Sequence, residues 1–279
     1  MEREQYFCRA GRPVPVDLGY RPEDAFRPSV WLDSSAVPGC MCSHSGWFVM
    51  PCRQEGLVKH KTDEILIFVG GDPADPENLN GEIELQLEQD KLTLTHTCVV
   101  FIPAGAAHGN LEVKRADKPI LHFTIQMSES DYSAEPAAAT APVGTYANHV
   151  VERYEPVDGS RPEAPPGFLT LLLWLDSQKL KSAPYLETVW FHTTNDTGPE
   201  EHMHDDLDEL IGFFGTDPEH PDELGGEVQF FVEGEPVSVR KSCIIYLPRG
   251  VRHSPILVPE LKRPIIHFSA GNGGDYARK

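Results

Sequence analysis

The sequence has no long hydrophobic run and is short of positive charge. No apolar stretch approaches the roughly 20 residues of a membrane-spanning helix, so we expect no membrane partner. The opening residues, MEREQYF, lack the apolar core and cleavage site of a secretory leader, which favours a cytoplasmic location. The chain has 24 basic and 43 acidic residues, which give a net charge of −19. This negative charge would repel a phosphate backbone. Nucleic acid is therefore not expected as a partner.

Cysteine is also scarce. Six cysteines in 279 residues are too few for a disulfide scaffold, and their spacing is not that of a paired CxxC zinc site, so we expect reduced thiols. Glycine (23) and proline (25) are abundant, which favours a chain of strands and turns over a helical bundle. The length is about twice that of a usual domain and allows two cores.

The sequence repeats itself. The segment Trp31-Leu32-Asp33-Ser34 recurs as Trp174-Leu175-Asp176-Ser177, at an offset of 143. Further on, an offset of 145 aligns residues 64–123 with residues 209–268 without a gap, and about three positions in ten are identical. A period this long indicates a tandem domain duplication rather than a solenoid.

The join between the two halves is also visible. Residues 128–166 are rich in alanine and proline and too poor in large apolar residues to form a core. We therefore predict an N-terminal domain at residues 1–145 and a C-terminal domain at residues 146–279.

Short apolar or alternating runs between turn residues predict strands in both halves, and helical periodicity is weak. Strands of four to seven residues at this spacing are typical of a sandwich or barrel. The predicted strands are residues 65–69, 82–87, 92–95, 99–102 and 120–126, and then 210–214, 227–232, 236–239, 244–247 and 265–269.

The most specific motif lies in the second half. His202 and His204 precede Glu209, and a Pro-x-Gly-x-x-His segment ends at His253. Two histidines at positions i and i+2 of a strand point the same way. A carboxylate after a short turn and an imidazole from a neighbouring strand can close on the same ion. Three histidines and one glutamate leave positions open on Fe, Mn, Ni or Zn, as a catalytic site requires.

The first half keeps part of this motif. His60, Glu64 and His108 are present, but Val58 stands where the first histidine would be. Two histidines and a carboxylate are enough to hold a ferrous ion as a facial triad. A second metal site and an empty remnant both fit the sequence.

The two motifs resemble those of the cupin superfamily, in which HxH, three or four residues and E are followed by PxGxxH. The resemblance implies two tandem double-stranded β-helix jelly rolls, that is, a metal-binding bicupin. It also implies that His202, His204, Glu209 and His253 are the ligands of a divalent metal. Two positions depart from the pattern, Ser242 for a glycine and Leu257 for an asparagine, and neither is a ligand.

Other polar residues are candidates for the pockets. His122 and His267 occupy equivalent places in a repeated Pro-Ile-x-His-Phe segment and either line a pocket or are core histidines bonded to backbone. Arg252 could hold a carboxylate, but as the immediate neighbour of a metal ligand it should point away from the metal. His44 and His220 lie in polar, turn-rich stretches and are expected to be exposed.

These features favour a metal-dependent enzyme that acts on a small organic molecule. A dioxygenase-type oxidoreductase with Fe(II) in the second half is our first hypothesis. A non-redox lyase, decarboxylase or isomerase is the alternative, and so is a bicupin that binds a ligand without turnover. Residues 1–29 are rich in proline and arginine and could form an arm that reaches a partner, so a homodimer is also expected.

Overall fold

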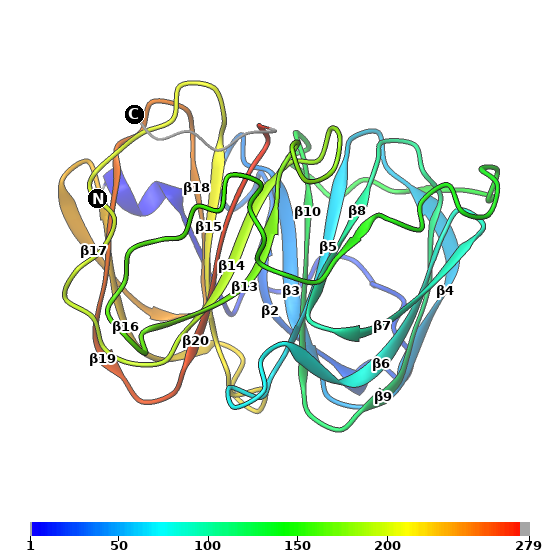
Figure 1. Ribbon diagram of the computed structural model, residues 1–279, viewed down its shortest axis with the longest axis horizontal. Helices are drawn as coiled ribbons and strands as arrows, with labels where there is room; N and C mark the ends of the chain where they lie inside the picture. The colour runs from blue at the N-terminus through cyan, green and yellow to red at the C-terminus, as the bar shows by residue number, and fades with distance from the viewer. Residues whose placement is uncertain (1, 274–279) are drawn as a thin grey trace.

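The computed structural model describes residues 2–273, which form two barrels of antiparallel strands side by side (Figure 1). Only two short 3-10 helices, η1 (Glu2–Tyr6) and η2 (Glu23–Ala25), accompany the strands in this part of the chain. The predicted all-β class is confirmed. None of the helices in the described residues is long and apolar enough to cross a membrane.

The first barrel consists of two sheets with an apolar core between them. Its six-stranded sheet has the order β12-β8-β5-β10-β3-β2, and its five-stranded sheet has the order β11-β4-β9-β6-β7. The strands are β2 (Phe26–Leu32), β3 (Cys42–Phe48), β4 (Cys52–Lys59), β5 (Glu64–Gly70), β6 (Asn78–Leu87), β7 (Asp90–His96), β8 (Cys98–Ile102), β9 (His108–Ala116), β10 (Ile120–Gln126), β11 (Glu135–Pro136) and β12 (Val150–Val151).

The second barrel repeats this plan with a smaller second sheet. Its six-stranded sheet has the order β1-β18-β15-β20-β14-β13, and its three-stranded sheet has the order β17-β16-β19. The strands are β1 (Phe7–Arg9), β13 (Leu169–Leu175), β14 (Tyr185–Phe191), β15 (Glu209–Gly215), β16 (Glu223–Val232), β17 (Glu235–Lys241), β18 (Cys243–Leu247), β19 (His253–Leu261) and β20 (Ile265–Gly271).

The duplication found in the sequence is visible in the bounds of the strands. The offset of 145 relates β5 to β15 and the five following pairs end to end, and the offset of 143 relates β2 to β13 and β3 to β14. Every strand predicted from the sequence lies inside an observed strand. The sequence does not predict β3, because its buried residues include the polar Ser43, His44 and Ser45.

His44 is one correction to the sequence analysis. It was expected to be exposed, but it is buried in β3, where its ring stacks on Trp31 and its Nδ1 lies 3.0 Å from the Thr124 hydroxyl. The polar residues around it form a strand because neighbouring strands flank β3 on both sides. His220 is exposed, as predicted.

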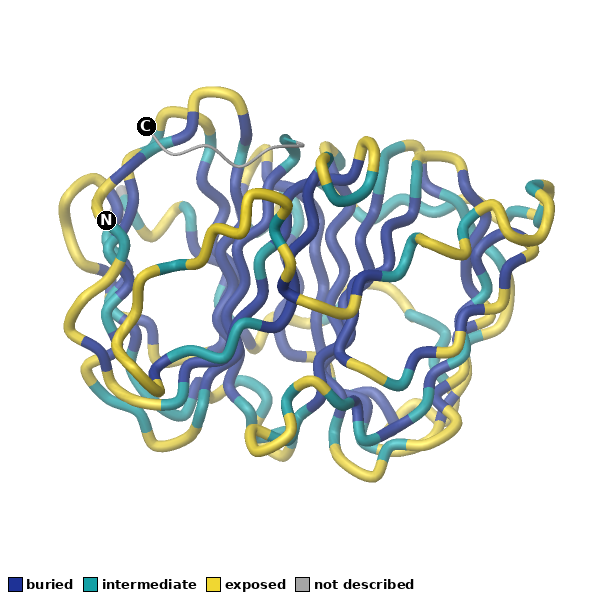
Figure 2. The backbone as a smooth tube through the Cα atoms, viewed as in Figure 1, coloured by how far each residue is buried: buried dark blue, intermediate teal, exposed yellow. Residues whose placement is uncertain are grey.

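The central strands are buried on both faces, as the dark tubes in the middle of Figure 2 show. In β20, Ile266 and Phe268 belong to the core between the barrels, whereas His267 and Ser269 line the interior of the second barrel. Phe123 of the first barrel stacks on Phe268 with 4.6 Å between ring centroids. This double burial explains why these strands are nearly continuous apolar runs.

Each barrel takes one short strand from the other half of the sequence. Phe7 of β1 pairs with Ile245 of β18, and Val150 of β12 pairs with Val100 of β8. Because β1 and β12 are related by the offset of 143, the exchange is reciprocal. Residues 7–9 of the expected arm thus reach the second barrel of the same chain. The boundary near residue 145 and the homodimer stay predictions.

The repeated Trp-Leu-Asp-Ser segment has a structural role. The indole N–H of Trp31 donates to Asp33 and that of Trp174 donates to Asp176, each at 2.8 Å. The other oxygen of each aspartate accepts the backbone N–H of the residue three positions further on. The motif therefore ends a strand and fixes the turn that follows it in both halves.

Candidate metal centre

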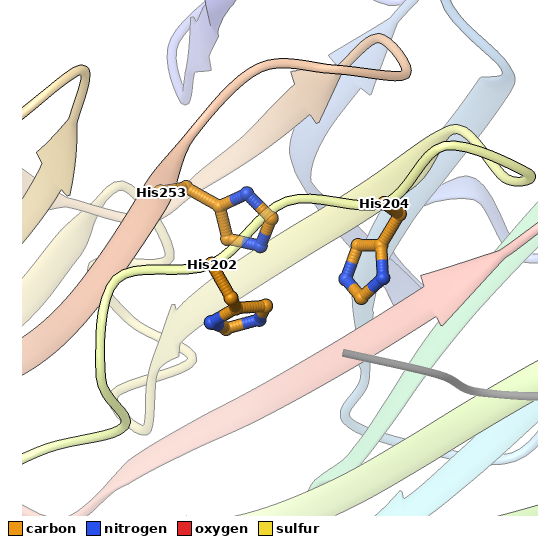
Figure 3. A group of neighbouring side chains, drawn as sticks. All are labelled: His202, His204 and His253. Carbon is orange, nitrogen blue, oxygen red and sulfur yellow. The ribbon is translucent and has the colours of Figure 1, made fainter. Parts of the chain in front are cut away.

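The three histidines of the second-half motif converge inside the second barrel (Figure 3), and Glu209 lies beside them. One ring nitrogen each of His202, His204 and His253 lies within 4.8 Å of the other two. Glu209 Oε2 lies 2.9 Å from His253 Nε2 and 3.4 Å from His204 Nε2. All four residues are buried. The structure thus brings together every residue of the predicted ligand set.

The segment that carries the first two histidines is not a regular strand, which corrects the sequence analysis. Before β15 it pairs with β19 only through two isolated bridges, Asn195 with Val258 and His202 with His253. A Gly-Pro pair and a run of aspartates interrupt the pairing here. In the first barrel the corresponding segment is the regular strand β4.

The Pro-x-Gly turn connects the two parts of each motif. Gly250 has φ +80°, a conformation that glycine adopts without strain, and its N–H donates to the carbonyl of His204 at 2.8 Å. Gly105 has the same φ and donates to the carbonyl of His60 at the same distance. His60 is therefore the structural counterpart of His204.

Backbone carbonyls set the tautomers of the histidines. His202 Nδ1 lies 2.7 Å from the carbonyl of Glu200, and His253 Nδ1 lies 3.0 Å from that of Val251. A carbonyl only accepts hydrogen bonds, so the proton of each neutral ring is on Nδ1. In this tautomer the lone pair is on Nε2, and a histidine whose Nδ1 donates to the backbone binds a metal through Nε2, which is the usual arrangement of metal-bound histidines.

The contacts of Glu209 support a cation at this place. Its Oε2 and His253 Nε2 are both buried and make no hydrogen bond, although they are only 2.9 Å apart. Two facing lone pairs repel each other unless a cation lies between them. Neighbouring ligands at about 2.1 Å from one ion are about 3.0 Å apart in octahedral geometry, which agrees with this distance. The donor set therefore fits a divalent metal.

The charge of Glu209 is also suitable. Burial raises the pKa of its carboxyl, but hydrogen bonds and charge from His204 and His253, when a proton is on their Nε2 atoms, outweigh burial and lower that pKa to about 2. A metal in place of these protons would favour the carboxylate in the same way. The carboxylate is therefore ionised at neutral pH and supplies one negative charge to the cluster.

The first barrel contains the smaller cluster. Glu64 Oε2 lies 3.2 Å from His60 Nε2 and 3.0 Å from His108 Nε2. Val58 pairs with His108 as His202 pairs with His253, so Val58 occupies the place of the missing imidazole. Burial raises the pKa of Glu64, but the two histidines outweigh burial and lower it. This triad could hold a divalent metal with one protein ligand fewer.

The two barrels differ in what covers their clusters. The second cluster opens into a pocket of about 80 Å³ with apolar walls that include Phe191 and Ile211. The pocket of the first barrel is smaller, about 60 Å³, and Tyr20 and Tyr132 line it. At the offset of 143, Tyr20 corresponds to Glu163, which lines the second pocket.

His122 and His267 combine the two roles considered from the sequence. Each lines the pocket of its barrel, and each Nδ1 lies 3.0 Å from a backbone carbonyl, that of Ile67 or Gly212. Burial is the main cause that lowers the pKa of His122 to about 3 and that of His267 to about 4. Both rings are neutral at physiological pH.

Arg252 lies outside the pocket. Its guanidinium pairs with Glu233 at 3.2 Å and with Glu201 at 3.4 Å, and 53% of its side chain is exposed. This is the outward direction that strand alternation implies for a neighbour of His253.

Glu187 and Ser269 also line the second pocket, although neither is among the predicted site residues. The spacing of two residues between His267 and Ser269 places both side chains on the same face of the strand and could have predicted Ser269.

Comparison with known proteins gives a match in structure only. No family model and no curated protein sequence matches the chain. A structure of Bacillus subtilis oxalate decarboxylase, described by its Mn(II) centres, matches with a TM-score of 0.60 and 9% identity over 96% of this chain and 80% of that chain. Lactobacillus farciminis oxalate decarboxylase in a formate complex matches with 0.57 and 11% identity over 96% and 89%. AerE from Microcystis aeruginosa matches with 0.52 and 12% identity over 96% and 98%.

Identities this low establish the fold and nothing finer. The chain has the two-barrel fold of these structures, the fold that the motifs predicted, and its two clusters of histidine and glutamate could each hold a divalent metal. Function has to be argued from the residues of the pockets themselves.

Proposed function

We propose that the protein is a metal-dependent enzyme that acts on a small organic molecule in its second barrel. The observation that carries this proposal is the unbonded oxygen of buried Glu209, which faces the Nε2 atoms of His204 and His253 beside an apolar pocket. His202, His204, Glu209 and His253 would hold the metal. The metal would supply Lewis-acid or redox chemistry at its open positions.

The residues around the metal cluster would form a pocket that excludes water and positions the substrate. Apolar walls such as Phe168, Val189 and Ile211 exclude water and hold the substrate beside the cluster. Glu163 and its neighbours, from the segment between the barrels, cover the mouth of the pocket. In the first barrel two tyrosines line this region, so we assign turnover to the second barrel.

The type of reaction follows from the metal. We propose a dioxygenase-type reaction with Fe(II) as the first candidate. A non-redox decarboxylation is the second candidate, because proteins of this fold include oxalate decarboxylases, one of them described by its Mn(II) centres. Oxygen uptake during turnover would support the first candidate, and turnover without oxygen uptake would support the second.

The metal site is tested by elemental analysis of protein purified without chelator or nickel resin. We compare the wild type with His253→Ala and with the matched first-barrel variant His108→Ala. We expect His253→Ala to lose about one equivalent of Fe or Mn and His108→Ala to keep it. The proposal fails if the wild type binds no metal after anaerobic reconstitution with Fe(II) and Mn(II), or if His253→Ala keeps its full metal content.

A further inference from the structure

The second pocket has no positive side chain. Among the described residues that line it there is neither lysine nor arginine, and Glu163 and Glu187 line it in addition to Glu209. The outer cavity that continues from its mouth includes Arg161, but also Glu163, Glu187 and two further glutamates. An anionic substrate usually meets a guanidinium or ammonium in its site. The lining of this pocket instead carries carboxylates, which accept hydrogen bonds.

His267 is the best-positioned acceptor. Its ring packs against both Phe191 and Phe213, at centroid distances of 5.1 and 4.9 Å and nearly parallel to both. Its Nδ1 donates to the carbonyl of Gly212, so Nε2 carries a lone pair. Burial keeps the pKa of this ring near 4, well below neutrality. A fixed, neutral imidazole can accept a hydrogen bond from a hydroxyl or N–H group, but it cannot neutralise a carboxylate.

The strand register sets a length for the ligand. Across β15 and β20, Glu209 is opposite Gly271 and Phe213 is opposite His267. The row of the sheet that contains the metal ligand Glu209 is therefore four residues along the strand from the row that contains His267. At about 3.4 Å per residue the backbones of the two rows are about 14 Å apart along the sheet. Ser269, with Ile211 opposite it, lies between the two rows and faces the same pocket. A molecule that contacts both the metal cluster and His267 therefore has to be longer than a two-carbon dianion.

We propose that the second pocket binds an uncharged, ring-sized molecule that donates a hydrogen bond from a hydroxyl or N–H group to His267 Nε2. Short dicarboxylates are not its ligands, although the fold is shared with oxalate decarboxylases, so this inference favours the dioxygenase-type reaction over the decarboxylation considered above. The inference rests on the proposed function only in taking this pocket as the substrate site. It assigns a substrate-binding role to His267 and a substrate class to the pocket.

The test measures binding and not turnover, both to metal-free protein and to protein reconstituted with Mn(II), because a bound metal could itself hold a carboxylate. The probes are 2-naphthol, 2-methoxynaphthalene, 2-naphthoate and oxalate, of which the first three differ only in the group offered to His267. The variants are His267→Phe, which keeps a ring against the two phenylalanines but has no acceptor, and its first-barrel match His122→Phe. Fluorescence titration measures the naphthalenes, and calorimetry measures oxalate.

We expect 2-naphthol to bind the wild type more tightly than 2-naphthoate and oxalate. His267→Phe should weaken 2-naphthol about five- to tenfold, the value of one lost hydrogen bond, while leaving 2-methoxynaphthalene unchanged. His122→Phe should leave 2-naphthol binding as in the wild type, and His267→Gln, which keeps an acceptor, should recover part of the loss.

Tighter binding of 2-naphthoate or oxalate than of 2-naphthol to the wild type would overturn the substrate class, even if no variant folds. Equal affinity of 2-naphthol for the wild type and a folded His267→Phe would overturn the role of His267. Either result leaves the metal analysis of His253→Ala untouched. Conversely, a protein without metal could still pass this test, so the two proposals fail separately.

Discussion

At the scale of single residues, the surroundings of each imidazole decide what it does. In His253 and His267 alike, Nδ1 donates to a backbone carbonyl and Nε2 is left with a lone pair. His253 Nε2 faces the carboxylate of Glu209, which fits a shared cation. His267 packs against two phenylalanine rings, which fits a neutral acceptor.

The buried neutral histidines predict a loss of stability in acid. The folded-state pKa is about 4 for His267 and about 3 for His122, against 6.5 for an ordinary histidine. Above pH 6.5 neither state binds a proton at these sites. Below it only the unfolded state does, so each site costs about 1.4 kcal/mol of stability per pH unit until the pH reaches the folded pKa.

Urea unfolding of metal-free protein at pH 7.5 and pH 5.0 measures this effect. His267→Phe removes one of the two groups, so its stability should fall less between these pH values than that of the wild type, by about 2 kcal/mol. An equal fall in both proteins would contradict the argument.

At the scale of elements, the segment between the barrels has no core and is held by carboxylates of the first barrel. Asp90 accepts the backbone N–H of Gly144 at 2.6 Å and that of Tyr146 at 2.8 Å, and Glu88 accepts that of Ala141 at 2.9 Å. Asp90 and Glu88 are both buried next to the turn between β6 and β7. Figure 1 shows the segment, in green, crossing from the first barrel to the second.

This arrangement predicts that Asp90→Ala loosens the segment. Two backbone N–H groups lose a charged acceptor, so we expect a loss of about 1–3 kcal/mol in the free energy of unfolding. Amide hydrogen exchange should become faster around residues 140–149. The control is Glu235→Ala at the equivalent position of the second barrel, which is exposed and should leave exchange in this segment unchanged. Unchanged exchange in Asp90→Ala would contradict the assignment.

At the scale of the whole molecule, the two barrels share one core. Phe123 packs on both Phe214 and Phe268 across the interface, and the exchanged strands β1 and β12 tie each barrel to the other half of the chain. Neither six-stranded sheet could expose this face to water without uncovering a large apolar surface. The barrels should therefore depend on each other for stability.

We predict that the wild type unfolds in a single transition for both barrels. Phe268→Ala should lower the free energy of unfolding by about 3–5 kcal/mol and weaken the coupling between the barrels. Scanning calorimetry together with urea unfolding followed by tryptophan fluorescence and circular dichroism tests this. Two separate transitions in the wild type would show that the barrels are independent.

The sequence alone determined the duplication, the all-β class and the candidate ligands. Strands with one face toward solvent, such as β6, alternate between buried and partly exposed residues. This alternation allows each such strand to be predicted from its own sequence. The residues His202, His204, Glu209 and His253 stand in a short motif and its partner, so spacing was enough to group them. The internal repeat supported these predictions because equivalent strands and motif residues occur in both halves.

Only the tertiary structure decided the burial of His44, the reciprocal exchange of β1 and β12, and the cover of each pocket. It also decided that Arg252 points outward and that no described lysine or arginine lines the second pocket. These features depend on contacts between residues far apart in the chain. A local pattern records the spacing and alternation of neighbours, whereas burial, cover and charge in a pocket are set by which distant segments pack against each other.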